Sequence, residues 1–240
     1  MTSITSLAQV ATEAIPTPRP HLQHLQSMAR ARGPIAVAVA YPCDAGSLQA
    51  ALQAAQAGLI TPILVGPQSR IESAAHAAGL SLDCASIHPT ADDPRAAAAQ
   101  AAALCRDGQA KALMKGSLHS DDLLGAAVAR EAGLRGNHRA SHVFVMDIPS
   151  YDRPLLMTDC VVNIFPTLMD KRDIAQNAVH LAHAIGIAQP RVAVLSAVET
   201  VNPAIPGTID AAALCKMAER GQLTGGIFDG PLAYDNAISL

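Results

Sequence analysis

Residue types that handle anions and protons gather between Lys111 and Asp147. Lys115, Gly116 and Ser117 follow a short apolar run, which places them at the carboxyl end of a predicted strand. Ligands of open α/β sheets bind at that end of the strands. Glycine lets a ligand approach the backbone, a serine hydroxyl donates a hydrogen bond, and lysine supplies positive charge for phosphate. The alternative is an ordinary turn between a strand and a helix, because the spacing of a Walker loop is absent.

A basic loop follows the helix that is predicted after this turn. It contains Arg135, His138 and Arg139, and a guanidinium group binds phosphate through two parallel hydrogen bonds. Asp121 and Asp122 lie in the first turn of the helix and would repel an anion there. We therefore expect arginine or lysine side chains to hold most of the charge of a ligand. The alternative is two solvated arginines on a surface loop.

Other candidate residues end predicted strands or begin predicted helices. Ser120 is predicted to be the N-cap of the helix after the Lys115 turn. Carboxylates at Asp229 and Asp235 could act as bases or hydrogen-bond acceptors, or cap a helix. Ser196 and Glu199 follow another strand, but without the GxSxG motif of nucleophilic serines. The histidines and cysteines match no metal-site or CxxC spacing, so we expect no bound metal.

The composition excludes several classes of protein. The 240 residues are 50% hydrophobic but only 2% aromatic, and the formal net charge is −3. Without a basic run or an aromatic stripe, we expect no nucleic-acid partner. The apolar runs are much shorter than a membrane span, so we expect no membrane partner. Five scattered cysteines and the lack of a secretory signal predict reduced thiols in the cytoplasm.

Apolar runs alternate with helical segments in the first half of the chain. Strands are predicted at residues 35–40, 63–65, 85–88 and 112–114. This alternation predicts a parallel sheet with helices on both faces. The pattern changes after Gly136, where runs at 142–148 and 155–164 are joined by too few residues for a crossover helix. We therefore predict an antiparallel hairpin there.

The last hundred residues return to alternating helices and strands. A helix is predicted at 170–185, a buried strand at 191–196, a second helix at 209–220 and a short strand at 226–229. We predict a flexible leader at residues 1–20, a first α/β domain at 21–138 and a second α/β domain at 139–240.

Five stretches resemble the phosphate acetyl/butyryltransferase family in the same order along the chain. They are LMKGSLHSDDLL, GLRGNHRASHVFVMD, LLMTDCVVNIFPT, PRVAVLSAVETVNPAIPGT and FDGPLAYDNAIS. The resemblance extends from about residue 35 to residue 240 and is densest after Leu113. The stretch GPLAYDNAIS resembles the butyryltransferase branch and the acyltransferase domains that are fused to enoyl-CoA hydratases.

The resemblance implies two three-layer αβα domains flanking a cleft, as in phosphotransacetylases and isocitrate dehydrogenases, and a homodimer. It implies an acyltransferase that moves an acetyl or butyryl group between coenzyme A and inorganic phosphate. The deprotonated thiol of coenzyme A would attack the acyl phosphate carbonyl directly. Acyl-CoA and phosphate would be substrates, with no cofactor, metal or covalent acyl-enzyme.

Matching the motifs one by one implies substrate-binding positions in both predicted domains. Those in the first are Lys115, Gly116, Ser117, His119 and Ser120. Arg135 is added to them because of its positive charge in the basic loop. Those in the second are Arg139, Ser141, Asp229, Gly230, Asp235 and Asn236.

Members of the family continue beyond the position of Leu240, with a segment that returns to the first domain. That segment carries a Ser-Arg pair and a catalytic aspartate, so we expect the general base there. Without it, the first domain would expose apolar surface and an open sheet edge. One alternative is a non-catalytic relative that binds coenzyme A or acyl phosphate or serves in assembly. Decarboxylating dehydrogenases share the fold, but their acidic metal cluster and the Rossmann motif are absent from the sequence.

Overall fold

The computed structural model describes residues 19–130 and 133–239. The predicted leader therefore lies outside the described residues, except for its last two positions. The chain divides into two compact units. Residues 24–137 form one of them, which we call the sheet unit. Residues 19–23 and 138–239 form the other, which we call the ribbon unit.

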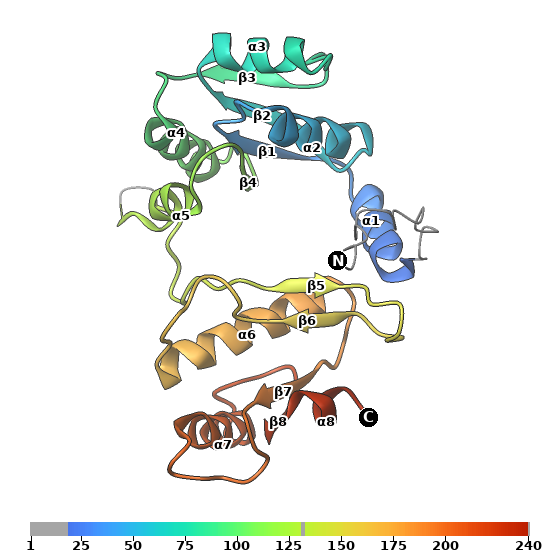
Figure 1. Cartoon of the computed structure of the whole chain (residues 1–240), viewed down its shortest axis with the longest axis vertical. Coiled ribbons are helices and arrows are strands. Elements are labelled where there is room, and N and C mark those ends of the chain that lie inside the picture. Colours follow the sequence, from blue (N-terminus) through green and yellow to red (C-terminus); the bar gives the residue numbers. More distant parts are fainter. Residues whose placement is uncertain (1–18, 131–132, 240) are drawn as a thin grey trace, which may run out of the picture. The chain divides into compact units, whose positions relative to one another are not determined.

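Four parallel strands form the sheet of the sheet unit, in the order β3-β2-β1-β4 (Figure 1). They are β1 (Ile35–Ala40), β2 (Ile60–Gly66), β3 (Ser86–Pro89) and β4 (Ala112–Lys115). Ala40 lies beside Val65 on one neighbour and Lys115 on the other, so the carboxyl ends of these strands lie at one edge. The parallel sheet that was predicted from the alternating pattern is confirmed.

Both faces of this sheet are covered by helices, because β1 is apolar at every position. Val37 and Val39 pack on one side with residues of α2 (Ala45–Gln56) and α3 (Gln68–Ala77). Ala38 and Ala40 pack on the other side, mainly with the alanines of α4 (Pro94–Arg106). Leu123 and Ala126 of α5 (Ser120–Val128) pack against that second cluster. Successive strand residues point to opposite faces, so one unbroken apolar run supplies both cores.

Local hydrogen bonds explain where two of these helices begin. Asp44 caps α2 by accepting from Ser47 N at 2.7 Å, and Asp93 caps α4 by accepting from Arg95 N at 3.0 Å. The predicted cap at Ser120 is wrong. His119, with an extended backbone, occupies the N-cap position of α5, and Ser120 is already the first helical residue.

The ribbon unit holds two separate pairs of strands (Figure 1). Strands β5 (Phe144–Met146) and β6 (Leu155–Met157) form the predicted antiparallel hairpin. Strands β7 (Arg191–Leu195) and β8 (Ile227–Leu232) pair in parallel. The helices are α6 (Leu168–Ala184), α7 (Pro206–Glu219) and α8 (Tyr234–Ile238). At its start, α1 (Pro20–Ala31) is held by Asp147, whose carboxylate accepts from His21 N and Leu22 N.

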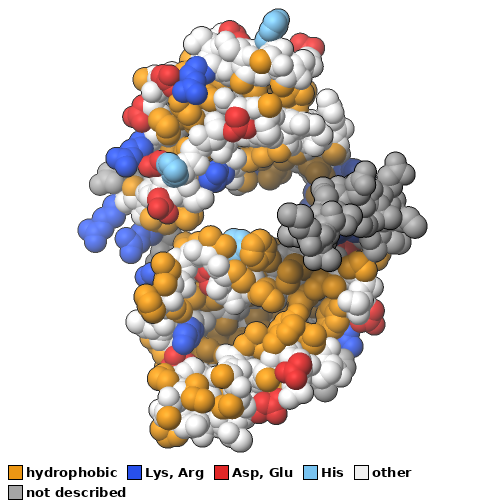
Figure 2. All heavy atoms as spheres, in the orientation of Figure 1, with side chains coloured by type: hydrophobic (Ala, Val, Ile, Leu, Met, Phe, Trp, Pro, Cys, Tyr) orange, Lys and Arg blue, Asp and Glu red, His pale blue; other side chains and the backbone are white. Residues whose placement is uncertain are grey.

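Strand β7 is not the fully buried strand that was predicted. Its residues alternate between exposed and half-buried, and Leu195 is 47% exposed. The apolar run RVAVL favours a buried strand, but in the described part of this unit β7 pairs only with β8. Figure 2 shows many hydrophobic side chains on the visible face of the ribbon unit. Among the described helices, none combines the length and the apolar character needed to cross a membrane.

Candidate functional site

The turn after β4 is packed directly on the backbone that follows β1. Gly116 N donates to Ala40 O and Ser117 N donates to Tyr41 O, each at 2.9 Å. A Cβ atom at Gly116 would lie 2.4 Å from Ala40 O and 2.6 Å from Tyr41 O. Only glycine fits this position, so its conformational role is to let the two loops touch.

The Ser117 hydroxyl joins the same two loops. It donates to Tyr41 O at 2.8 Å and accepts from Cys43 N at 2.9 Å. A hydroxyl has a single hydrogen, and here Tyr41 O receives the hydrogen that the sequence analysis assigned to a ligand. Burial raises the pKa of the Cys43 thiol to about 11, so this thiol stays protonated near neutral pH.

A hydrogen-bonded cluster lies beside this turn and was missed by the sequence analysis. The Tyr41 hydroxyl donates to Asp92 Oδ1 at 2.5 Å and accepts from Arg70 Nη1 at 2.6 Å, and Arg70 Nη1 also donates to Asp92 Oδ1 at 3.0 Å. The hydrogen bond to Asp92, with burial, raises the pKa of Tyr41 to about 12. The tyrosine therefore remains neutral. The sequence offered one sign of this cluster: Tyr41, Arg70 and Asp92 come after the carboxyl ends of β1, β2 and β3, respectively.

Three further predicted residues lie around the start of α5. Lys115, His119 and Ser120 are exposed at the end of β4 and the beginning of the helix. Asp122, one of the acids expected to repel an anion, is paired with Arg95 at 2.9 Å. The structure thus brings Lys115, Gly116, Ser117, His119 and Ser120 to one edge of the sheet.

Arg139 is held in the ribbon unit through its backbone and its side chain. Its backbone N donates to Asp173 Oδ2 at 3.0 Å, and its Nε donates to Asn163 Oδ1 at 2.8 Å. Asn177 Nδ2 donates to both Arg139 O and Ser141 Oγ. The predicted residues Arg139 and Ser141 are therefore neighbours in a fixed segment. The Arg139 side chain is still 54% exposed, which leaves it accessible to a ligand.

Asp159 and Asn163 build the loop that receives Arg139, and the sequence analysis missed them. Asp159 accepts from the backbone N of His142, Val161 and Val162, and from Asn163 Nδ2. Partial burial acts to raise the pKa of Asp159, but these hydrogen bonds outweigh it and lower the value to about 2. The signal was the spacing in DCVVN, because aspartates often bond to backbone N–H groups two or three residues ahead.

The two arginines of the basic loop fall in different units. Arg135 is exposed in the sheet unit, whereas Arg139 belongs to the ribbon unit. His138 Nδ1 lies 3.6 Å from Asp173 Oδ1, which also accepts from Arg172 Nη2 at 2.6 Å. An open hollow of about 330 Å³ beside them is lined by His138, Arg172, Asp173, Gln176, His180, Gln222 and Thr224.

The remaining predicted residues lie on β8 and α8. Gly230 contacts β7, where an added Cβ would lie 2.7 Å from Val194 O. Asp229 Oδ1 accepts from Gly230 N at 2.8 Å, and Asp235 is exposed in the first turn of α8. Asn236 Nδ2 donates to Glu199 Oε1, so the glutamate after β7 joins this group.

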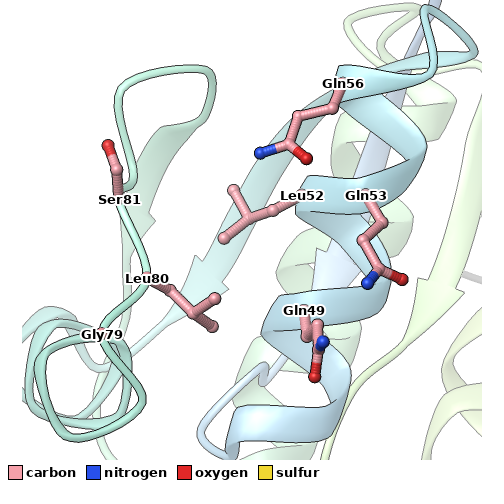
Figure 3. Close-up of a pocket in the computed structure, with 7 residues that line it drawn as sticks. All are labelled: Gln49, Leu52, Gln53, Gln56, Gly79, Leu80 and Ser81. Carbon is pink, nitrogen blue, oxygen red and sulfur yellow. The ribbon is translucent and has the colours of Figure 1, made fainter.

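A second hollow, of about 210 Å³, contains none of the predicted residues (Figure 3). It lies between α2 and the segment after α3 and is lined by Gln49, Leu52, Gln53, Gln56, Gly79, Leu80 and Ser81. None of these side chains is charged. Within the described part of the chain, no three His, Cys, Asp or Glu residues are grouped so that they could hold a metal ion.

Comparison with known proteins identifies relatives over most of the chain. The family described as "Phosphate acetyl/butaryl transferase" matches residues 90–240. The phosphate acetyltransferase of Rhizobium meliloti is 55% identical over 216 residues, which are 89% of this chain and 67% of that protein. The phosphate acetyltransferase of Rickettsia felis is 50% identical over 86% of this chain and 59% of its own length. The phosphate butyryltransferase of Clostridium acetobutylicum is 41% identical over 85% and 67%.

Solved structures give the same fold. A branched-chain phosphotransacylase from Enterococcus faecalis matches with a TM-score of 0.72 and 27% identity, over 85% of this chain and 71% of that one. The EutD phosphotransacetylase from Staphylococcus aureus matches with a TM-score of 0.73 and 20% identity, over 91% and 74%. The chain spans 59 to 67% of the length of the three sequence relatives named above.

Proposed function

We propose, since this chain belongs to the phosphate acetyl/butyryltransferase family, that it takes part in acyl transfer between coenzyme A and inorganic phosphate. The observation that carries the proposal is the turn after β4, which lies inside the matched region. There Gly116 and Ser117 are fixed against the β1 loop while Lys115 remains exposed. An exposed cation beside a fixed glycine turn at the carboxyl edge of a parallel sheet suits an anionic acyl phosphate.

In this proposal the protein supplies binding and orientation rather than a nucleophile. The thiolate sulfur of coenzyme A attacks the acyl carbonyl carbon, the bond to the phosphate oxygen breaks, and phosphate leaves with the electron pair. A base takes the thiol proton. Lys115 and Arg139 hold negatively charged groups of the substrates, and His119, Ser120, Ser141 and Arg135 add polar contacts. Asp229, Gly230, Asp235 and Asn236 are proposed as a further substrate-binding group. No metal or cofactor takes part.

The proposal extends to domains, assembly and location. We propose that residues 21–138 and 139–240 act as two domains, that the protein is a homodimer, and that it works in the cytoplasm. Ile164 and Phe165 of the ribbon unit, 81% and 94% exposed, support a further protein contact. The five cysteines are free in the structure, and free thiols suit the reducing cytoplasm.

A thiol-release assay tests the proposed reaction. The purified chain is mixed with acetyl-CoA or butyryl-CoA and phosphate, and free coenzyme A is measured. Turnover with either acyl-CoA supports the proposed reaction. Arg139→Ala should raise KM for phosphate or coenzyme A about tenfold, because a charge-assisted hydrogen bond contributes about 1.5–3 kcal/mol. The melting temperature should fall little, since this exposed side chain adds little to a core.

Arg220→Ala serves as the control, because it removes an exposed arginine at the end of α7 that is not among the predicted substrate-binding residues. Its KM values should equal those of the wild type. Coenzyme A binding in a calorimeter without any turnover would favour the non-catalytic alternative. Equal loss of activity and thermal stability in Arg139→Ala would assign this arginine a structural role.

A further inference from the structure

The Tyr41 cluster joins the segments that follow three strands, at the edge of the sheet where the proposed site lies. Tyr41 follows β1, Arg70 lies in the first turn of α3, and Asp92 follows β3. Arg70 Nη1 lies 3.0 Å from Asp92 Oδ1, and the Arg70 guanidinium carbon lies 5.4 Å from the centre of the Tyr41 ring. Their charges balance, and the hydroxyl of the neutral phenol is hydrogen-bonded to both of them.

The other end of Tyr41 is bonded to the substrate turn. Its carbonyl oxygen accepts from both Ser117 N at 2.9 Å and Ser117 Oγ at 2.8 Å. Its φ of 51° is in the left-handed region, which residues other than glycine rarely adopt. Such a backbone persists when its surroundings fix it, and here the hydroxyl fixes the far end of the side chain.

We propose that Tyr41, Arg70 and Asp92 are positioning residues that hold the turn of Lys115, Gly116 and Ser117 in its binding shape. This inference rests on the proposed acyltransferase function of that turn. Tyr41 is only 5% exposed and its hydroxyl has both a donor and an acceptor partner. The cluster therefore acts on the substrate through the Tyr41 carbonyl and Ser117.

The test uses Tyr41→Phe in the full chain, because phenylalanine keeps the ring and deletes the hydroxyl. Two quantities are measured: amide hydrogen exchange at Gly116 and Ser117, and the kinetics of thiol release with phosphate as the varied substrate. We expect exchange at these two amides to become about three to ten times faster. We expect KM for phosphate to rise by a similar factor, with kcat within about twofold of the wild type.

Matched variants distinguish a positioning role of the cluster from a general loss of protein stability. Tyr151→Phe deletes a hydroxyl in the other unit and should change neither quantity. Arg70→Gln should reproduce the effects of Tyr41→Phe, and Arg70→Lys should restore part of the protection because it keeps a donor. Glu72→Gln, on the same helix, should behave like the wild type, since Glu72 contacts Gln68 rather than the cluster.

The exchange measurement decides the inference separately from the proposed function. Wild-type protection at Gly116 and Ser117 in Tyr41→Phe would overturn the positioning role, whatever the activity. A lower kcat with an unchanged KM would also overturn it. If the wild-type chain releases no thiol but exchange rises only in the cluster variants, the cluster holds the turn and the proposed reaction is what fails.

Discussion

Among the described glycines of the sheet unit, Gly116 has the least space for a side chain. Its missing side chain lets the turn after β4 lie on the carbonyl groups of Ala40 and Tyr41. The atoms that a Cβ would meet are backbone atoms of a central strand and its loop, which cannot move like the end of a flexible side chain. The substrate turn and the β1 loop therefore depend on each other.

We predict that Gly116→Ala lowers the free energy of unfolding by about 1–3 kcal/mol or more, since overpacking displaces backbone in a close-packed core. Urea unfolding followed by circular dichroism measures this loss. Gly125→Ala is the matched control, because nothing lies within 4 Å of its added Cβ in α5. It should stabilise the protein by up to about 1 kcal/mol through helix propensity. Equal stability of the two variants would contradict the close contact at Gly116.

At the scale of elements, most of the sheet unit is predictable from the sequence. Strands β1 and β2 are largely buried and appear as apolar runs, and the helices that follow β1 and β3 are capped by Asp44 and Asp93. The Lys115 turn was found because it ends such a run. Tyr41, Arg70 and Asp92 were not found, because they lie 22 to 51 residues apart and no local pattern links them. Only the pairing of strands brings them together.

The ribbon unit was predicted less well, because a side chain that bonds to the backbone limits the length of one of its strands. The second run of the hairpin was expected to extend to residue 164, but β6 ends at Met157. Just beyond it, Asp159 accepts hydrogen bonds from the backbone N–H groups of Val161 and Val162. A carboxylate that bonds backbone N–H groups competes with strand pairing, and the apolar pattern alone does not show this. Arg139 was singled out by its charge and by the family motif, but its partner Asn163 was not.

The Asp159 loop should make the stability of the ribbon unit depend on pH. The folded pKa, about 2, lies below the ordinary value of 3.8. The stabilisation is therefore present above about pH 4 and is lost as the pH falls from 4 to 2. We predict a loss of roughly 1–2 kcal/mol over this range, allowing for partial exposure. Asp159→Asn should be less stable at pH 7 and should change less between pH 4 and pH 2.

Urea midpoints at a series of pH values measure this dependence. Asp152→Asn provides the control, because the Asp152 side chain is 87% exposed and lies in the same unit. Its pH profile should follow that of the wild type. If Asp159→Asn kept the full wild-type slope between pH 4 and pH 2, another carboxyl group would be responsible.

On the scale of the whole molecule, each unit has an apolar core of its own. The two large clusters of buried residues lie entirely within residues 37–126 of the sheet unit. The ribbon unit buries Ile174, Val179 and Ala182 of α6 and Ala211 and Leu214 of α7. It also leaves Ile164 and Phe165 largely exposed, whereas the sheet unit buries more than half of the residues of β1 and β2. The two units should therefore differ in stability.

We predict that the full chain unfolds in two calorimetric transitions and that core substitutions act on them one at a time. Leu48→Ala in the sheet unit should lower one transition, since deleting a fully buried leucine side chain costs about 2–5 kcal/mol. Val179→Ala, 1% exposed in α6, should lower the other. Each substitution serves as the control for its partner. A single transition that moves equally in both variants would mean that the chain folds as one cooperative body. In that case the division near residue 138 would describe contacts but no independent domains.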